Sequence, residues 1–419
     1  MSQTLQSESG STTPAEIPAS AGLHDNWRKI FSFWLITRIL LSAWAALCSV
    51  SFPRSPLEKN LPLAPPGQPF GDWLARALLA PWDRWDVEHF LKIATRGYSV
   101  DDGTLSFHPL YPILGKVVGA VFGGHTLLGL FLVSNVCCLL FLLCFERLAR
   151  LDLASDEAYR ATFYFTLLPS AVVLFAPYTE SLFLLLSALA LLMARRGRWL
   201  LAGLTGGLAA LTRQQGIFLL LPLAWEFWEW SEKSPRKMLA NWRGAVGLLL
   251  VPAGLLTWLI YRAFTLSDVV IDLRRPGTLI YGLLISRSAT QIVEQQSLMA
   301  PWKALWIALN IPSYANRIDL CAGAVYLLIL AFGGRMLWRL RPSYFLYSLA
   351  TVVISFSLST GNMESYMGLP RHCLLAFPLA LPLAVWGRKP VAGLSFTAIG
   401  IVGLFAMSLF YVGKILWVP

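Results

Sequence analysis

The sequence predicts an all-α protein that crosses a membrane many times. Of its 419 residues, 56% are hydrophobic and only 14% are charged, and the mean hydropathy is +0.59. A soluble domain has about a quarter of its residues charged. Long apolar runs recur along the chain, and a backbone inside lipid must pair its own polar groups, so we expect these runs to be helices. An outer-membrane barrel would require short segments of alternating polarity, which the sequence lacks.

The net charge of +11 fits a membrane protein better than a nucleic-acid binder. Lys and Arg accumulate in the cytoplasmic loops of membrane proteins, so no nucleic-acid partner is expected. The six cysteines lie mostly in apolar runs, without a CxxC pair or a Cys/His metal spacing. We therefore expect them to be small core residues, and we predict no metal site from them.

The N-terminal tail, residues 1–26, is rich in small and polar residues and is expected to be disordered. It lacks the basic-then-apolar order of a signal peptide. The first apolar run, about 28–50, is therefore predicted to be an uncleaved anchor. Residues 27–419 are expected to form a single transmembrane domain.

The apolar runs give about eleven candidate spans. They cover about residues 28–50, 125–147, 158–176, 178–194, 199–212, 216–230, 242–264, 318–338, 343–358, 371–387 and 391–413. Segment 108–124 is also apolar, but it is short and contains two prolines and four glycines. If this segment does not cross and the N-terminus is cytoplasmic, the later basic loops all face the cytoplasm, as the positive-inside rule requires. We therefore predict that 108–124 is an interfacial or partly re-entrant helix.

The opposite, external side then collects the unusual polar residues. It contains a first loop, 51–124, with interfacial helices, and a second large loop, 265–317. Within the second loop, 289–309 has an amphipathic pattern and is predicted to lie on the membrane surface. Clustered polar residues at one membrane face indicate a site at that face.

Residues 82–98 are the most informative stretch, because acids, bases and aromatic residues alternate there just outside a predicted span. On a short helix, Asp86 and His89 would share one face and Glu88 would point elsewhere. Asp86, beside Trp85, could act as general base for a hydroxyl group. A solvated helix with ordinary ion pairs is the alternative interpretation.

Other charged residues stand at helix ends on the same side. Glu180 follows Tyr178 at the start of an apolar helix. A helix N-terminus favours a carboxylate by about 0.3–1 kcal/mol, so simple capping is one interpretation, whereas an acid at a membrane boundary is often functional. Arg213, followed by Gln214, and Arg371 have the fork that suits phosphate oxygens. Contact with lipid headgroups is the alternative for both arginines.

His108 opens a rigid stretch, 108–112, whose two prolines fix the turn into the interfacial segment. His108 could face the site, although a structural role is the simpler expectation.

Four motifs resemble those of the PIG-V-type mannosyltransferases. They are WDVEHF at 85–90, FHPLYP at 107–112, PYTESLF at 177–183 and RQQG at 213–216. The resemblance covers about residues 80–225 and implies a GT-C glycosyltransferase, a polytopic enzyme whose first external loop forms two juxtamembrane helices. The family's catalytic acid corresponds to Asp86 and its second acid to Glu180, and Glu88 also matches. His108 departs from the pattern, because the family often has an aromatic residue there, and the last third of the chain matches poorly.

The resemblance implies transfer of mannose from a polyprenyl- or dolichyl-phosphate donor to a lipid- or glycan-linked acceptor on the extracytoplasmic or lumenal side. The sequence has no nucleotide-binding motif, which agrees with a lipid-carried donor. In this hypothesis Asp86 and Glu88 join Glu180 as catalytic acids. Candidate substrate-binding residues are Trp85, His89, His108, Tyr178, Arg213, Gln214 and Arg371, with Trp82, Trp85 and Tyr178 able to stack on sugars.

Several alternatives stay open at this point. A transporter or lipid flippase, or a non-catalytic partner subunit, would also be polytopic. No cofactor is required by the sequence, although a Mg or Mn ion between carboxylates and phosphate is an option. The membrane would be the plasma membrane in a prokaryote and the endoplasmic reticulum membrane in a eukaryote, with membrane lipids and a further membrane subunit as candidate partners.

Overall fold

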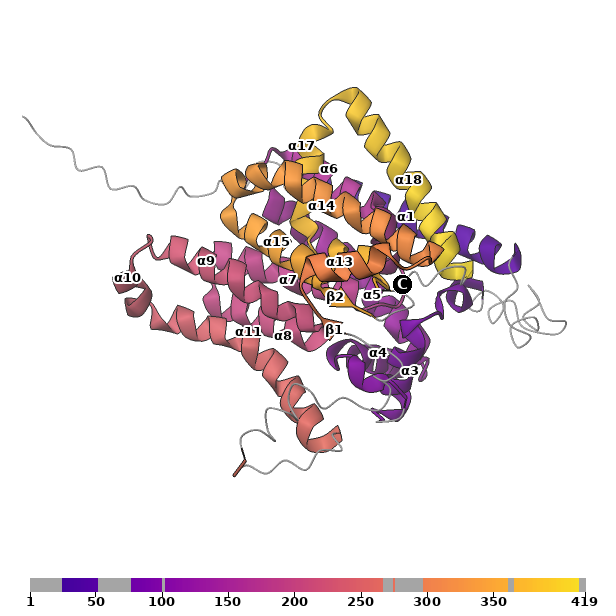
Figure 1. The fold of residues 1–419 in the computed structure, drawn as a ribbon, viewed down its shortest axis with the longest axis horizontal. Coiled ribbons are helices and arrows are strands. Elements are labelled where there is room, and N and C mark those ends of the chain that lie inside the picture. Colours follow the sequence, from indigo (N-terminus) through magenta and orange to yellow (C-terminus); the bar gives the residue numbers. More distant parts are fainter. Residues whose placement is uncertain are drawn as a thin grey trace, which may run out of the picture.

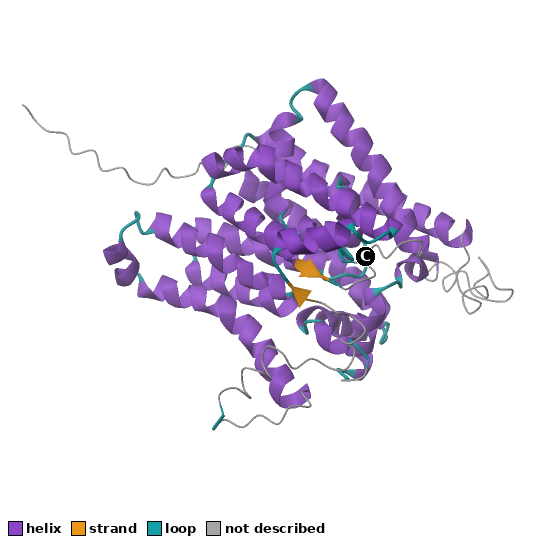
Figure 2. Cartoon of the chain, viewed as in Figure 1, coloured by secondary structure: helices purple, strands orange, loops and turns teal. Residues whose placement is uncertain are grey.

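The computed structural model describes residues 25–51, 77–99, 102–266, 274–275, 297–360 and 365–413. Almost all of this part is helical (Figure 2). Two strands of two residues each, β1 (Ser297–Leu298) and β2 (Leu358–Ser359), form a single antiparallel pair. The all-α prediction is therefore confirmed. The tail up to residue 24 lies outside the described residues, whereas 25 and 26 already belong to the first helix.

Five helices are long and apolar enough to cross a membrane, judged by length and composition. They are α1 (Asp25–Ser51), α5 (Thr126–Ala149), α11 (Trp242–Tyr261, extended by η5, Arg262–Leu266), α14 (Tyr314–Leu340) and α18 (Pro390–Gly413). Figure 1 shows α1 and α18 side by side at one edge. Apolar side chains such as Ile39 on α1 and Val402 on α18 are 57% and 70% exposed. Such a surface is stable in lipid and not in water, so the chain is an integral membrane protein.

The other predicted spans are also helical, but several are broken into pieces. The remaining helices of this set are α6 (Ser155–Leu167), η3 (Pro169–Leu174), α7 (Glu180–Arg195), α8 (Trp199–Thr212), η4 (Gln214–Leu219), α9 (Leu220–Trp230), α15 (Pro342–Ser357), α16 (Leu369–Leu374), η8 (Phe377–Leu379) and α17 (Ala380–Trp386). The short helix α10 (Pro235–Ala240) lies between two predicted spans. Leu168, for example, has ψ of 137° because proline at 169 excludes the helical conformation from the residue before it. A total of about eleven crossings stays a prediction.

The described part of the first external loop contains two α-helices, α3 (Asp86–Arg96) and α4 (Leu110–Val121), with short turns η1 (Ala80–Trp82) and η2 (Thr104–Ser106). The 12 residues of α4 reach about 18 Å, against about 30 Å of membrane core. This length agrees with the prediction that 108–124 does not cross. Helix α4 packs tightly on α5, because a Cβ at Gly129 would lie 2.1 Å from the carbonyl oxygen of Gly115.

Helix α13 (Pro301–Leu309) is the described end of the predicted amphipathic stretch 289–309; residues 289–296 lie outside the described part. Its small residues Ala304 and Ala308 are buried, whereas Trp302 and Trp306 are exposed. Exposed tryptophans on one face are typical of a helix at the membrane interface. Asn316 in α14 donates a hydrogen bond to the carbonyl oxygen of Ala308 (2.7 Å) and fixes this helix.

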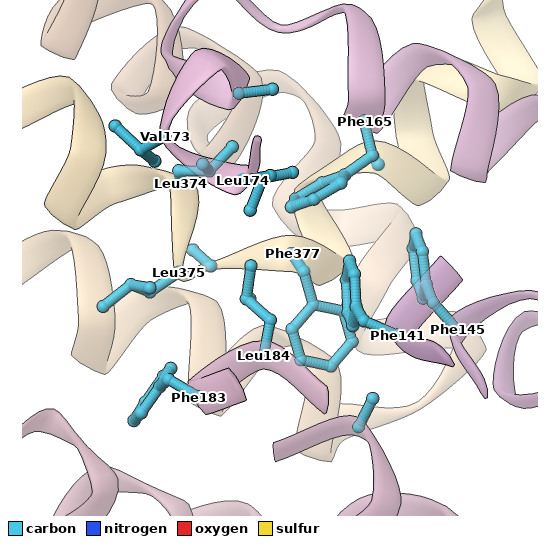
Figure 3. Packing of buried hydrophobic residues seen from close by; sticks show 14 of the residues in the cluster. Phe141, Phe145, Phe165, Val173, Leu174, Phe183, Leu184, Leu374, Leu375 and Phe377 are labelled. Carbon is cyan, nitrogen blue, oxygen red and sulfur yellow. The ribbon is translucent and has the colours of Figure 1, made fainter. Parts of the chain in front are cut away.

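The apolar core lies between α5, α6, α7 and the η8–α17 segment. Figure 3 shows Phe141 and Phe145 of α5 facing Phe165 and Phe377. The Phe145 and Phe377 rings meet edge to face at 5.2 Å, and those of Phe141 and Phe165 at 5.1 Å. This packing holds η3 and η8 in place, and the chain runs from η3 to Glu180 and from α16 into η8. The core therefore fixes two of the segments that carry charged residues.

A buried ion pair joins α9 to the start of α15, at the predicted cytoplasmic side. The carboxylate of Glu226 accepts two hydrogen bonds from Arg341, at 2.9 and 2.7 Å, and one from Ser343 at 2.6 Å. The Glu226 side chain is only 3% exposed. Removal of Glu226 takes away the buried partner of Arg341 and leaves it with Glu229 at 3.3 Å, a side chain that is 20% exposed.

We expect Glu226→Gln to lower the free energy of unfolding by about 3 kcal/mol. This is the low end of the range for a broken buried pair, because the Arg341 side chain is 25% exposed. Unfolding in detergent, followed by tryptophan fluorescence, measures the change. Glu232→Gln is the control, since that side chain is 74% exposed. Equal effects of the two substitutions would contradict a stabilising role for the buried pair.

Candidate active site

Asp86 is the first residue of α3, at an unusual turn of the chain. The residue before it, Trp85, has φ of 56°, which non-glycine residues rarely adopt. The last turns of α18 hold this turn, because Trp85 Nε1 donates to the carbonyl oxygen of Tyr411 (3.3 Å) and the Tyr411 hydroxyl donates to that of Trp82 (3.0 Å). The backbone N–H of Asp86 donates to the hydroxyl of Tyr178 (3.4 Å). Contacts from distant segments therefore fix the position of Asp86.

Glu180 is the first residue of α7, and its side chain is 0% exposed. Arg213 Nη1 donates to Glu180 Oε1 at 2.5 Å and to the hydroxyl of Thr179 at 2.7 Å. The pKa of Arg213 is lowered, chiefly by burial, while Glu180 acts in the opposite direction. The hydrogen bonds of Arg213 to Thr179 and Glu180 connect the α8–η4 turn to the beginning of α7.

Arg371, on α16, brings the two acids together. Its Nη1 donates to Asp86 Oδ2 at 2.6 Å, and its Nε lies 3.3 Å from Glu180 Oε1. The guanidinium also covers the ring of Tyr178, 5.2 Å from the centroid. Asp86, Glu180, Arg213 and Arg371, called here the charged quartet, thus meet although 285 residues separate the first and the last. Its two acids and two arginines have balanced formal charges.

Two residues that the sequence analysis did not select extend the charged quartet. Arg213 Nη2 lies 3.1 Å from His372 Nδ1, and Gln215 Nε2 lies 3.4 Å from the same atom. Gln214, the predicted residue, is exposed, whereas Gln215 is buried. Arg213 is extended, with φ of −154° and ψ of 145°, so consecutive side chains point in different directions. The sequence offered one indication of His372, because this residue directly follows Arg371.

Glu88 and His89 lie outside the charged quartet. Glu88 pairs with Lys92 at 2.8 Å on the outer face of α3, and its side chain is 70% exposed. His89 stacks on Phe107, with ring centroids 4.9 Å apart. The structure therefore separates Glu88 from Asp86, as the helical spacing predicts.

The rings of Trp82 and Tyr178 are fully buried, which contradicts the expectation that they stack on sugars. The guanidinium of Arg38 lies 4.7 Å from the Trp82 ring centroid and covers it. Only Trp85, which is partly exposed, keeps a ring that a sugar could reach without rearrangement. Aromatic motifs alone do not distinguish a ring that packs the core from one that lines a site.

His108 is buried beside Trp258, with ring centroids 5.8 Å apart. Burial, assisted by Arg213 and Arg262, lowers its pKa from 6.5 to about 3. Its Nε2 is buried without a hydrogen-bond partner within the part of the chain that the structure describes. The imidazole is therefore neutral in the folded protein at neutral and mildly acidic pH.

This neutral histidine predicts acid sensitivity. Above pH 6.5 the ring is neutral in both the folded and the unfolded protein. Between pH 6.5 and about 3 only the unfolded chain takes up the proton, so the free energy of unfolding decreases as the pH is lowered. The limiting slope for one proton is about 1.4 kcal/mol per pH unit. His108→Gln should flatten the dependence of unfolding free energy on pH by part of this amount. The same substitution at the exposed His125 controls for loss of a histidine as such, and an unchanged slope in His108→Gln would contradict the prediction.

His, Cys, Asp and Glu side chains do not gather in groups of three that could hold a metal ion, as far as the described residues extend. The quartet contributes only two carboxylates, and each already contacts an arginine. A divalent cation therefore stays a prediction without a preformed set of protein ligands in this part of the chain.

Comparison with curated proteins gives matches to one family in the first half of the chain. GPI alpha-1,6-mannosyltransferase 2 from Rattus norvegicus is 32% identical over 207 residues, which are 46% of this chain and 42% of that protein. The Homo sapiens protein of the same name is 32% identical over 185 residues, 41% of this chain and 36% of that one. The chain thus spans less than half the length of the relatives it matches.

Two solved membrane-protein structures are similar over a longer part of the chain. ArnT from Cupriavidus metallidurans in the apo state has a TM-score of 0.49 and 14% identity, covering 81% of this chain and 76% of that one. The archaeal oligosaccharyltransferase AglB from Archaeoglobus fulgidus, in complex with an inhibitory peptide and a dolichol-phosphate, has a TM-score of 0.44 and 16% identity, covering 90% and 56%.

The family match contains three members of the charged quartet. It extends over residues 28–224 and is to the mannosyltransferase (PIG-V) family. Asp86, Glu180 and Arg213 all lie inside this range, and Arg371 lies outside it. Residues 28–224 of this chain are therefore similar to the mannosyltransferase (PIG-V) family.

Proposed function

We propose that this protein is an integral-membrane mannosyltransferase that takes mannose from a polyprenyl- or dolichyl-phosphate donor. The observation that carries the proposal is the charged quartet, in which two acids and two arginines from four segments meet. Glycosyl transfer from a lipid phosphate needs a base for the acceptor and cations for the leaving group. The quartet supplies both kinds of group, and the match of residues 28–224 to the mannosyltransferase (PIG-V) family supports mannose as the sugar.

The proposed reaction is a direct displacement at the anomeric carbon. The acceptor hydroxyl oxygen forms a bond to the anomeric carbon while the bond between this carbon and the oxygen of the donor phosphate breaks. The hydroxyl proton passes to Asp86, and the lipid phosphate leaves with the bonding electron pair. Arg371 and Arg213 stabilise the negative charge that grows on the phosphate, an interaction that is stronger in the transition state than before it.

The exposure of the two acids assigns them different roles in this proposal. Glu180 is enclosed, with 0% of its side chain exposed, whereas the Asp86 side chain is 24% exposed. The two acids and two arginines of the quartet already balance in charge before the donor phosphate enters. One acid must therefore give up its contact with an arginine so that the arginine can bind the phosphate. Asp86 can do so and turn to the acceptor hydroxyl. Glu180 then orients the two arginines, and Glu88, on the far face of α3, takes no part in the chemistry.

The orientation in the membrane is part of the same proposal. The distribution of basic residues among the loops supports a cytoplasmic N-terminus, with the quartet on the extracytoplasmic or lumenal side. The membrane would be the plasma membrane in a prokaryote or the endoplasmic reticulum membrane in a eukaryote. The acceptor is lipid- or glycan-linked, and a membrane subunit and a Mg or Mn ion belong to the hypothesis as further components.

Sugar transfer in membranes tests the proposal. Membranes that contain the wild-type protein receive radiolabelled polyprenyl-phosphate-mannose, and lipid, glycan and protein products are separated. Label in a new product, absent from membranes without the protein, would support the transferase. Movement of the labelled lipid between leaflets without any new product would favour the transporter or flippase instead.

A further inference from the structure

The contacts of His372 determine which of its ring nitrogens carries the proton. Arg213 Nη2 lies 3.1 Å from Nδ1. A guanidinium has donors and no acceptor, so Nδ1 must accept this hydrogen bond. The Gln215 amide, 3.4 Å from the same nitrogen, can donate as well. The ring is therefore neutral, and its proton is on Nε2.

The resulting Nε2–H group is an uncommitted donor. None of the described residues accepts a hydrogen bond from it, and the ring is only partly buried. Two of the neighbouring donors are already occupied, because Arg213 Nη1 bonds Thr179 and Glu180 and Arg371 Nη1 bonds Asp86. The Nε atoms of both arginines are enclosed by protein. A ligand that approaches the two arginines from outside thus meets the His372 donor beside them.

We propose that His372 is a substrate-binding residue whose Nε2–H donates a hydrogen bond to a phosphate oxygen of the donor lipid. The inference rests on the proposed function, because it assumes that this lipid phosphate is what approaches Arg213 and Arg371. His372 bonds the first of these cations and is adjacent in sequence to the second. A neutral donor suits this position. It can bind the phosphate, and because it carries no charge it does not attract the carboxylates of Asp86 and Glu180.

Two substitutions separate the two nitrogens. Asparagine at 372 places its amide near the position of Nδ1, so its oxygen can still accept from Arg213, but no donor remains at the outer position. Glutamine is longer and places its amide nitrogen near the position of Nε2, while the acceptor for Arg213 is lost. If His372 only orients Arg213, His372→Gln should be the more damaging change. If Nε2–H binds the phosphate, His372→Asn should be the more damaging change.

The experiment measures binding of farnesyl phosphate to the full-length protein in detergent by titration calorimetry. We expect His372→Asn to weaken binding about 10–100-fold, the usual effect of losing one hydrogen bond to a charged group. His372→Gln should retain most of the affinity. Farnesol, which lacks the phosphate, and inorganic phosphate, which lacks the lipid, are titrated separately; the effect should appear with both phosphate compounds and not with farnesol.

Three results would overturn the inference. His372→Gln binding more weakly than His372→Asn would assign the residue to orientation of Arg213. Wild-type affinity in both variants would remove His372 from the binding site. Failure of the wild-type protein to bind farnesyl phosphate and to transfer labelled mannose would overturn the proposed function as well. Thermal unfolding of each variant establishes that the protein compared is folded.

Discussion

Asp86→Asn should lower the rate of sugar transfer by about 10²–10⁴-fold, the usual effect of losing a well-placed general base. Asparagine has nearly the same shape and keeps an oxygen that can accept the hydrogen bond that Arg371 donates at 2.6 Å. The fold should therefore survive, because the Arg371 guanidinium keeps its partner and its place over Tyr178. The measurement is initial rate of transfer from labelled polyprenyl-phosphate-mannose, at equal amounts of folded protein.

The matched control for Asp86→Asn is Glu88→Gln, on the same helix. This change also removes one carboxylate, but from a side chain that is 70% exposed and lies 2.8 Å from Lys92. We expect its transfer rate to stay near that of the wild type. A nearly normal rate in Asp86→Asn would remove Asp86 as the base. A loss of rate in Glu88→Gln as large as that in Asp86→Asn would place the chemistry on the other face of α3.

Glu180→Gln should lower the free energy of unfolding by about 3–5 kcal/mol, because it removes the carboxylate that the buried Arg213 contacts, whereas Arg371 keeps Asp86. Arg213 donates to Glu180 at 2.5 Å, and Arg371 Nε lies 3.3 Å away. The side chains of Glu180, Arg213 and Arg371 are 0%, 10% and 10% exposed, so solvent cannot replace the missing charge. The measurement is unfolding free energy in detergent, with transfer activity measured on the folded fraction.

A double substitution distinguishes a lost ion pair from damage to packing. Arg213→Met should also destabilise the protein, since it leaves Glu180 with one fewer cation. The double variant Glu180→Gln/Arg213→Met should lose less stability than the sum of the two single losses, because each first change already breaks the same pair. Strictly additive losses, or wild-type stability in Glu180→Gln, would contradict the assigned ion pair.

The helices were predictable because membrane insertion leaves a strong pattern in sequence. Each predicted apolar run within the described part is helical, and the short segment 108–124 contains a helix of 12 residues. Breaks within the runs were harder to predict. The break at Leu168 follows from the proline after it, but nothing local determines whether such a break bends a span or ends it.

The site was predictable only in part. Asp86, Glu180 and Arg213 stand in short motifs at helix ends, where charge next to apolar sequence is costly and therefore visible. Trp82 and Tyr178 were misjudged as sugar platforms, because burial depends on which other segments cover a ring, and here α18 and Arg38 cover them. His372 has no local motif, and the two side chains that contact its ring nitrogen Nδ1 are more than 150 positions away in the sequence.

By itself, the sequence determined that this protein is helical and lies in a membrane. These properties follow from composition and from charge placement along the chain, which need no knowledge of packing. Only the tertiary structure decided which charges pair. Asp86 and Arg371 are 285 residues apart, and the bond between them exists because α16 packs against η3 and α14 beside the start of α7. The packing of α3 against α4 leaves Glu88 exposed, because a helix can bury only one of its faces against its neighbours.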